Sequence, residues 1–229
     1  MKLFNPDNPV VRFFDIVANI VIINVITLVC CIPLFTMGAA LTADYYVCLK
    51  MLRDEDSGIV KLYFKSFKEN FRQALILEII ILAFTGLPAY LLAFVSSNFD
   101  TSAGGPRYAV IILAAVIALA AFCLVLVFPA LSRFGNTVGG ILKTGFYMSF
   151  SNPFRTLLIM LITAAPFVLA YNFPVLIPVV VLCGVTLPAY TSMALLKKVV
   201  KKLEDMTYEA NNLAVPGSED EHIFNDTEG

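Results

Sequence analysis

The sequence is poor in charged residues and contains a single histidine. Only 14% of the 229 residues are Asp, Glu, Lys or Arg, whereas 59% are hydrophobic, and the mean hydropathy is +0.83. A water-soluble domain of this size cannot present so much apolar surface to solvent. The formal net charge of -1 shows no excess of either sign, which argues against nucleic acid as a partner. We therefore expect a chain that is inserted in a lipid bilayer.

Residues that typically carry catalysis or hold metals are scarce or badly spaced. The histidine, His222, lies in a polar C-terminal stretch, and the five cysteines occur in apolar runs without zinc-site or disulfide spacing. The glycine-rich run 139–145 contains a lysine, but Leu142 precedes it where a phosphate-binding loop requires glycine. We therefore predict that the protein is not an enzyme and has no catalytic residue, no metal and no cofactor.

Long apolar runs predict membrane-spanning helices. A helix needs about 20 apolar residues to cross a hydrocarbon core of about 30 Å. No charged residue occurs from Thr156 to Leu196, and the Asn172-Phe173-Pro174 stretch divides this run, because proline disfavours helix in the preceding residue. The sequence thus predicts five spans, at residues 14–35, 74–95, 108–131, 156–172 and 174–196.

The expected fold is all-α. It is a polytopic transmembrane helix bundle over residues 1–203, with cytoplasmic amphipathic helices in the connections. The remaining residues, 204–229, are polar and acidic, and we expect them to form a disordered cytoplasmic tail.

The distribution of basic residues predicts how the spans are oriented. Thirteen of the sixteen Lys and Arg residues lie in the connections after the first and third spans or after the fifth. Short cytoplasmic connections are enriched in Lys and Arg. We therefore expect a multi-pass protein of the cell membrane with its N-terminus outside and its C-terminus in the cytoplasm.

One connection carries a basic aromatic segment that forms a candidate interaction surface. Its cations and rings fall on adjacent faces of a helix: Lys61, Phe64, Lys65, Phe67, Lys68, Phe71 and Arg72. Such a helix can lie on a bilayer with an anionic inner leaflet, rings toward the acyl chains and charges on the headgroups. Two alternatives remain open: a membrane-flanking helix with no specific partner, and a docking surface for another protein.

Three polar residues within the predicted spans form a candidate intramembrane polar site. Asn19 and Asn24 lie in the first span, and Glu78 lies near the start of the second. The asparagines can join helices by hydrogen bonds, since a buried amide in a bilayer finds a partner on a neighbouring helix. Glu78 can reach the interface, pair structurally, or serve as a proton or solute site.

A weak repeat relates the two halves of the chain. Tyr63-Phe64-Lys65-Ser66-Phe67 aligns with Phe146-Tyr147-Met148-Ser149-Phe150 at an offset of 83 residues. Three span ends also share a proline followed three residues later by a hydroxyl: Pro33 and Thr36, Pro129 and Ser132, Pro188 and Thr191. We expect these hydroxyls to cap the helices that follow.

The N-terminal half resembles the YesL family of bacterial membrane proteins. The resemblance rests on Leu3-Phe4-Asn5, Asn24, Pro33, Thr36, Gly38-Ala39-Ala40, Thr42-Ala43, Tyr45-Tyr46 and residues 66–73. It implies a membrane protein of unknown molecular function that is often encoded beside sugar-uptake and polysaccharide-degradation genes, and it implies no catalytic residues. Beyond Arg107 it depends on the span pattern alone.

Two functional hypotheses follow. The first is a non-enzymatic accessory or interaction component linked to carbohydrate uptake and utilisation, with a sugar-uptake transporter or another membrane protein as its partner. The alternative is a small-solute transporter or channel, which requires a polar path past Asn24 and Glu78.

Overall fold

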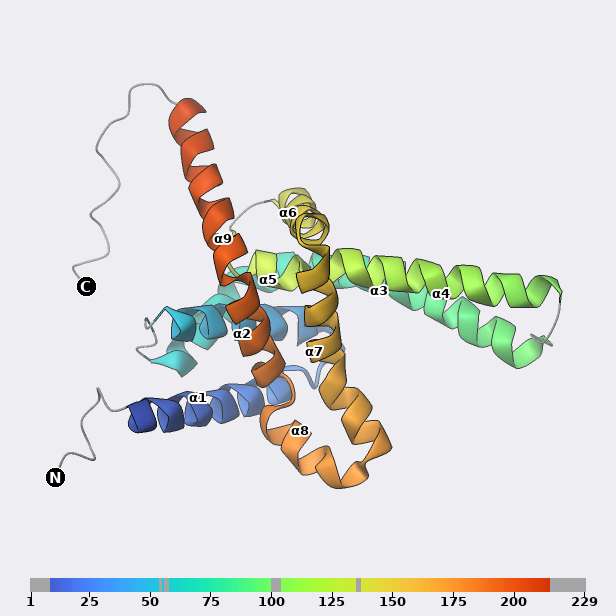
Figure 1. Ribbon diagram of the computed structural model, residues 1–229, viewed down its shortest axis with the longest axis horizontal. Helices are drawn as coiled ribbons and strands as arrows, with labels where there is room; N and C mark the ends of the chain where they lie inside the picture. Colours follow the sequence, from blue (N-terminus) through green and yellow to red (C-terminus); the bar gives the residue numbers. More distant parts are fainter. Residues whose placement is uncertain (1–8, 54, 56–57, 100–103, 135–136, 215–229) are drawn as a thin grey trace. The chain divides into compact units, whose positions relative to one another are not determined.

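The computed structural model describes residues 9–53, 55, 58–99, 104–134 and 137–214, and all regular structure within them is helical (Figure 1). The helices are α1 (Pro9–Cys30), α2 (Met37–Leu52), α3 (Ile59–Asn98), α4 (Gly105–Leu124), α5 (Val127–Leu131), α6 (Val138–Ser151), α7 (Pro153–Asn172), α8 (Ile177–Cys183) and α9 (Thr186–Ala214). Two 3-10 turns, η1 (Leu34–Thr36) and η2 (Pro174–Leu176), precede α2 and α8. The prediction of an all-α fold is confirmed.

In the described part of the chain, four helical segments are long and apolar enough to cross a membrane: Val11–Cys30, Ile59–Asn98, Pro106–Leu131 and Pro153–Asn172. A fifth candidate is the pair α8 and α9, which is bent by 58° where the two helices meet. Helix α2 is not among them and belongs to the connection between the first two spans. The chain is therefore a multi-pass membrane protein with a polytopic helical bundle.

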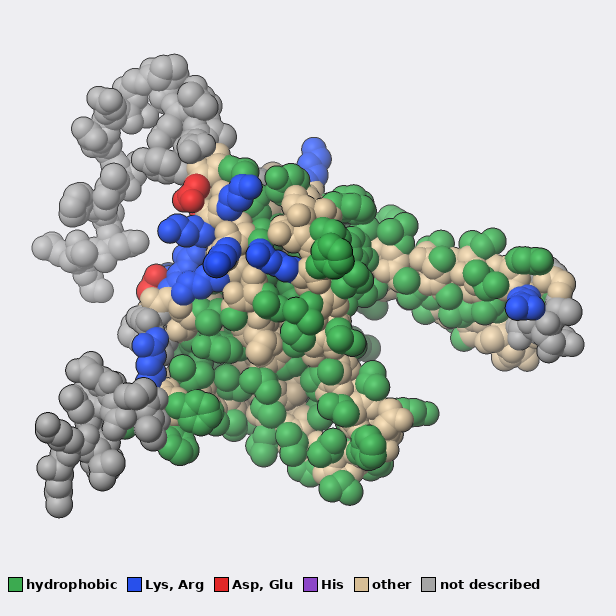
Figure 2. Space-filling view, in the orientation of Figure 1, with side chains coloured by type: hydrophobic (Ala, Val, Ile, Leu, Met, Phe, Trp, Pro, Cys, Tyr) green, Lys and Arg blue, Asp and Glu red, His purple; other side chains and the backbone are tan. Residues whose placement is uncertain are grey.

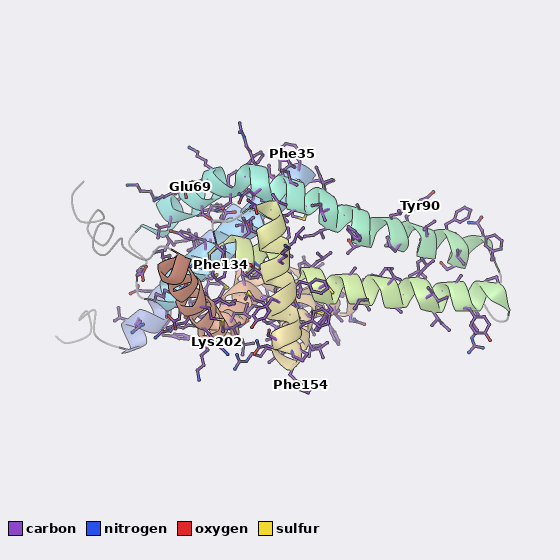
Figure 3. All side chains as sticks on the ribbon, turned by 90° about the horizontal axis from the view of Figure 1, so that it is seen from above. Phe35, Glu69, Tyr90, Phe134, Phe154 and Lys202 are labelled. Carbon is purple, nitrogen blue, oxygen red and sulfur yellow. The ribbon has the colours of Figure 1, made fainter. Side chains whose placement is uncertain are left out.

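Helices α3 and α4 run side by side as an antiparallel hairpin whose apolar side chains are largely exposed (Figure 1). Leu87 is 62% exposed and Tyr90 is 69% exposed. Figure 2 shows hydrophobic side chains spread along this hairpin. Figure 3 places Tyr90 in the half of α3 beside α4, and Glu69 in the half that carries the basic residues. An exposed apolar helix surface of this extent is suited to lipid rather than to water.

The basic aromatic segment and the second predicted span form one continuous helix, α3. No proline or glycine occurs between Ile59 and Thr85 that would end the helix. In the second copy of the weak repeat, the aromatic segment and the span that follows it are two separate helices, α6 and α7. Pro153 separates them, because it forces Asn152 out of the helical region (φ −139°, ψ 64°).

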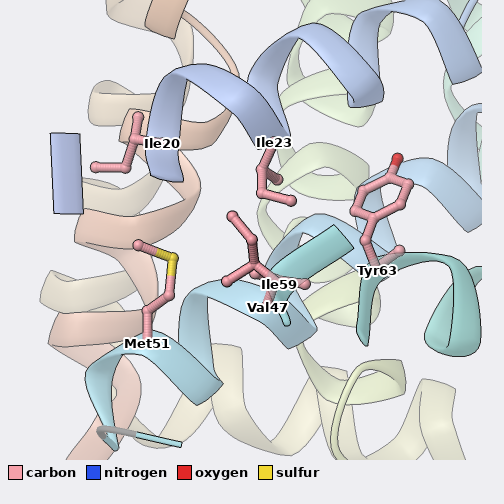
Figure 4. Packing of buried hydrophobic residues seen from close by; sticks show 7 residues of the cluster. Ile20, Ile23, Val47, Met51, Ile59 and Tyr63 are labelled. Atoms are coloured by element: carbon pink, nitrogen blue, oxygen red, sulfur yellow. The ribbon is translucent and has the colours of Figure 1, made fainter. Parts of the chain in front are cut away.

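A cluster of buried hydrophobic residues joins α1, α2 and α3 (Figure 4). Its fully buried hydrophobic members include Ile23 of α1, Val47 of α2 and Tyr63 of α3. Ala43 of α2 is also fully buried in this core, and a small side chain of this kind permits close helix packing. This core therefore holds α2, which lies in the connection between the first two spans, against both of those spans.

The three proline-hydroxyl pairs share one local hydrogen bond, but this bond does not cap the next helix. Thr36, Ser132 and Thr191 each donate their hydroxyl to the carbonyl of the proline three residues before, at 2.7, 2.7 and 3.0 Å. The side chain of Thr36 makes no capping bond at the start of α2, and α6 is capped instead by Thr137. Our capping expectation was wrong, because the nearby carbonyls of the helix end accept these hydroxyls first.

The chain divides into two compact units, Met1–Leu195 and Leu196–Gly229. In the second unit, α9 continues as a helix through Ala214. The predicted disordered tail, residues 204–229, thus begins within this helix, and residues 215–229 lie outside the described part of the chain.

Candidate functional site

Asn24 joins α1 to the break between α8 and α9. Its Nδ2 donates to the carbonyl of Val181 at 2.8 Å, and its Oδ1 accepts from the backbone N–H groups of Val185 and Thr186, both at 2.9 Å. The end of α8 and the start of α9 leave backbone groups without partners inside their own helices. One fully buried amide side chain therefore satisfies both sides of this break.

Asp44 lies next to this junction, on α2, and is completely buried. Its Oδ1 accepts the hydroxyl of Thr186 at 2.8 Å and lies 3.8 Å from Cys48 Sγ. Its Oδ2 has no hydrogen-bond partner among the described residues. Burial raises the pKa of Asp44 to about 7, because an apolar environment disfavours the charged carboxylate, and the bonds from Thr186 and Cys48 offset only part of that shift.

Glu78 serves the start of α2. Its Oε2 accepts the backbone N–H of Gly38 at 3.1 Å, and the side chain is 7% exposed. A carboxylate at a helix N-terminus satisfies a free N–H group and complements the helix dipole. Gly38 permits the approach, since a Cβ there would lie 2.9 Å from Phe128 Cε1 and 3.2 Å from Glu78 Oε2.

The structure does not gather the three predicted intramembrane polar residues into one site. Asn24 is bound to the α8–α9 break and Glu78 to the start of α2. Asn19 is half-buried and lies outside both arrangements.

The same junction borders a cavity of about 480 Å³. Its wall comes from both halves of the first unit, including α1, α2, α3, α4, α7 and the first residues of α9. Most of the lining is apolar, for example Leu28, Leu41, Ile81, Leu124, Phe128 and Phe167. Two lining residues carry polar atoms that have no partner among the described residues: Asp44 Oδ2 and Thr163 Oγ1. Buried polar atoms are nearly always hydrogen-bonded, so two unpaired atoms in residues that line the same cavity call for an explanation.

The basic aromatic segment is helical, with its cations exposed. Lys61, Lys65, Lys68 and Arg72 are exposed, and Phe64 is 42% exposed. Phe67 and Phe71 are half-buried, with ring centroids 5.8 Å apart, and Phe67 also stacks on Tyr63. Tyr63 and Ser66, on the remaining face, are buried. This helix therefore carries an exposed basic face and a face that belongs to the folded core.

Sequence reasoning did not select Asp44 or Thr163. A signal for Asp44 was present, because it is the only charged residue between Asp15 and Lys50. A lone acid in an apolar stretch is costly to bury and is a functional candidate by default. Thr163 had no comparable signal, because hydroxyls are common in membrane helices and usually bond to their own backbone.

Within the described residues, no three His, Cys, Asp or Glu side chains are grouped so that they could hold a metal ion.

Residues 20–91 match a family described as "Protein of unknown function, DUF624". The matched region begins in α1, contains all of α2 and reaches into the second half of α3, so it includes Asn24, Gly38, Asp44 and Glu78. No curated protein and no solved structure matches the chain.

Proposed function

We propose that this protein is a non-enzymatic membrane component whose cavity takes up a small apolar or amphipathic molecule. The observation that carries this proposal is that two residues lining a mostly apolar cavity, Asp44 and Thr163, each have a buried side-chain oxygen without a hydrogen-bond partner among the described residues. Small-molecule sites typically enclose about 300–1,000 Å³ and combine apolar walls with a few polar groups. Each unsatisfied buried polar atom costs about 1–3 kcal/mol, which a suitable ligand would recover.

The geometry favours this function over a channel for hydrophilic solutes. The polar path of the transporter hypothesis depends on Asn24 and Glu78, and both side chains are engaged with backbone groups of other helices. A sugar in the cavity would bury many hydroxyl groups against apolar side chains and lose their hydrogen bonds to water. A link to carbohydrate uptake would therefore operate through a partner protein rather than through this cavity.

We further propose that the protein is an accessory component of a sugar-uptake transporter or another membrane protein, as the YesL resemblance suggests. The exposed cations of α3 are its docking surface, and an anionic inner leaflet is the alternative occupant of that surface. This assignment places the basic connections in the cytoplasm and the N-terminus outside. A cysteine at Ser218 should then resist membrane-impermeant thiol reagents in intact cells, whereas a cysteine at Ser102 should react. Labelling of the Ser218 position before lysis would contradict this orientation.

The cavity function is tested by photolabelling in phosphatidylcholine nanodiscs with a neutral eight-carbon alcohol that carries a diazirine. We expect labelled peptides from the cavity-lining parts of α4 and α7. Ala121→Phe, on the cavity wall, should remove this labelling, whereas Ala115→Phe, on the exposed face of the same helix, should not. Labelling confined to the exposed α3–α4 hairpin, or equal labelling in the two variants, would refute cavity binding.

A further inference from the structure

Among the described residues, the carboxyl group of Asp44, which lines the cavity, is bonded to the Thr186 hydroxyl and the Cys48 thiol and to no basic side chain. Burial, the Thr186 hydroxyl and the Cys48 thiol account for the shifted proton affinity of Asp44, and no basic side chain contributes to it. Among the described residues, the titratable groups that interact with its charge are Cys31 just after α1, Tyr45 and Cys48 from α2, and Tyr63 from α3, while α9 presents Thr186. None of these groups is a cation at neutral pH.

We propose that the cavity binds a small amphipathic amine, whose ammonium group pairs with Asp44 and whose apolar tail lies among the cavity side chains. This inference rests on the proposed function and names the class of ligand. An ammonium group has three donors and no acceptor, which suits a carboxylate with one unbonded oxygen. Tyr45, Phe128 and Phe167 also line the cavity, and aromatic rings attract cations.

The size of the cavity restricts the source of the amine. A volume of about 480 Å³ is within the range for a drug-sized molecule, whereas a phospholipid with two acyl chains is much larger. The ammonium group of phosphatidylethanolamine has the same chemistry, but its tails would not fit. We therefore assign the site to a free, small amine rather than to a lipid headgroup.

Binding is coupled to a proton. Because burial raises the pKa of Asp44 to about 7, the carboxyl group is mostly protonated below that pH. An arriving ammonium ion stabilises the carboxylate, so Asp44 loses its proton to solvent as the cation enters, and the net charge of the cavity does not change. With one proton released per ammonium bound, affinity falls about tenfold for each pH unit below about 7.

The experiment compares two photoprobes of equal length in phosphatidylcholine nanodiscs: the eight-carbon diazirine alcohol and the matching primary amine. Labelling of cavity peptides is divided by labelling of the exposed α3–α4 hairpin, which corrects for partition into lipid. At pH 8 the amine should exceed the alcohol at least about tenfold in this ratio. At pH 5.5 the amine should lose most of that advantage, while the alcohol stays constant. Both changes follow from the protonation of Asp44, since a primary amine remains charged at both pH values.

Asp44→Asn should reduce amine labelling to the alcohol level at both pH values, and unchanged alcohol labelling shows that its cavity is intact. If that variant does not fold, Asp44→Glu should still prefer the amine.

Equal labelling of the wild type by both probes at pH 8 would overturn the ligand class and leave the proposed function standing. Absence of cavity labelling by either probe would refute both. Loss of amine labelling when phosphatidylethanolamine is added would assign the site to the lipid headgroup and overturn the free-amine proposal.

Discussion

Glu78 and Gly38 are 40 residues apart in the sequence and are joined by a hydrogen bond of 3.1 Å from the Gly38 N–H to Glu78 Oε2. The bond holds the start of α2 against α3, and α2 carries Asp44 in its second turn. The charged residue of the second predicted span thus positions the helix that bears Asp44.

Gly38→Ala should separate these two helices. The added Cβ would lie 2.9 Å from Phe128 Cε1 and 3.0 Å from the Ala74 carbonyl oxygen, and the backbone oxygen cannot move aside easily. Overpacking of this kind costs about 1–3 kcal/mol, so we expect a clear fall in the thermal midpoint measured in detergent. Gly86→Ala, in α3, is the matched control, because nothing lies within 4 Å of a methyl group added there and alanine favours helix. Equal midpoints for the two variants would show that the Gly38 contact is not tight.

Asn24→Leu should destabilise the protein more than Asn19→Leu does. The first change leaves the carbonyl of Val181 and the N–H groups of Val185 and Thr186 without their partner in a buried place. We expect a loss of at least about 3 kcal/mol for Asn24, since three buried groups lose their partner and each costs about 1–3 kcal/mol. Asn19 is half-buried in the same helix, and its replacement should change stability by less than about 1 kcal/mol. Chemical unfolding in mixed micelles measures both, and similar losses would show that the α8–α9 break does not depend on Asn24.

Asp44 should make the stability of the protein depend on pH. Its folded-state pKa of about 7 lies above the unfolded value near 3.8, so the folded state holds the proton more tightly. The stabilising effect is complete below about pH 4 and is lost as pH rises through about 7. Between pH 5.5 and 8.5 we expect the wild type to lose about 2 kcal/mol relative to Asp44→Asn, which keeps the acceptor for Thr186 and cannot ionise. Thermal midpoints at the two pH values test this, and parallel behaviour of the two proteins would show that Asp44 does not titrate in this range.

If the exposed cations of α3 form a docking surface, removing them should weaken the binding of a partner protein or of lipid. Replacing Lys61, Lys65 and Lys68 by glutamine should leave accumulation in the membrane nearly unchanged, because all three are exposed. It should weaken co-purification of a transporter subunit or binding to anionic vesicles several-fold, since each cation near an anionic leaflet contributes about 1 kcal/mol. Replacing Lys198, Lys201 and Lys202 removes the same charge from the second unit and serves as the control. If the α3 variant keeps its topology but fails to accumulate, this face belongs to the folded core.

The apolar spans and the helical basic aromatic segment were predictable because local composition determines them. A run such as residues 108–131 contains no charge, and no tertiary contact is needed to infer that it is helical and apolar. The spacing of Lys61, Lys65 and Lys68 likewise predicts a helix with one basic face. The continuity of α3 was less apparent, because composition changes sharply along it while no residue interrupts the helix.

The cavity was not predictable, because it depends on contacts between distant residues. Thr186 bonds to Asp44 across 142 positions, and its N–H bonds to Asn24 across 162. Asn24 and Glu78 were predicted as intramembrane polar residues and both are buried, but their partners are backbone groups that carry no residue-specific signal. Asp44 lies in a connection that the distribution of basic residues assigns to the cytoplasm, and its burial beside Thr186 depends on tertiary contacts that the sequence does not reveal.

The central claim is that a small molecule occupies the cavity beside Asp44. Anomalous diffraction from crystals grown in a lipidic phase with 1-bromooctane tests it most directly, because bromine marks its own position. We predict a bromine peak enclosed by α2, α4 and α7, and its loss in Ala121→Phe. Bromine found only along the exposed surface of the α3–α4 hairpin, with an empty cavity, would contradict the claim.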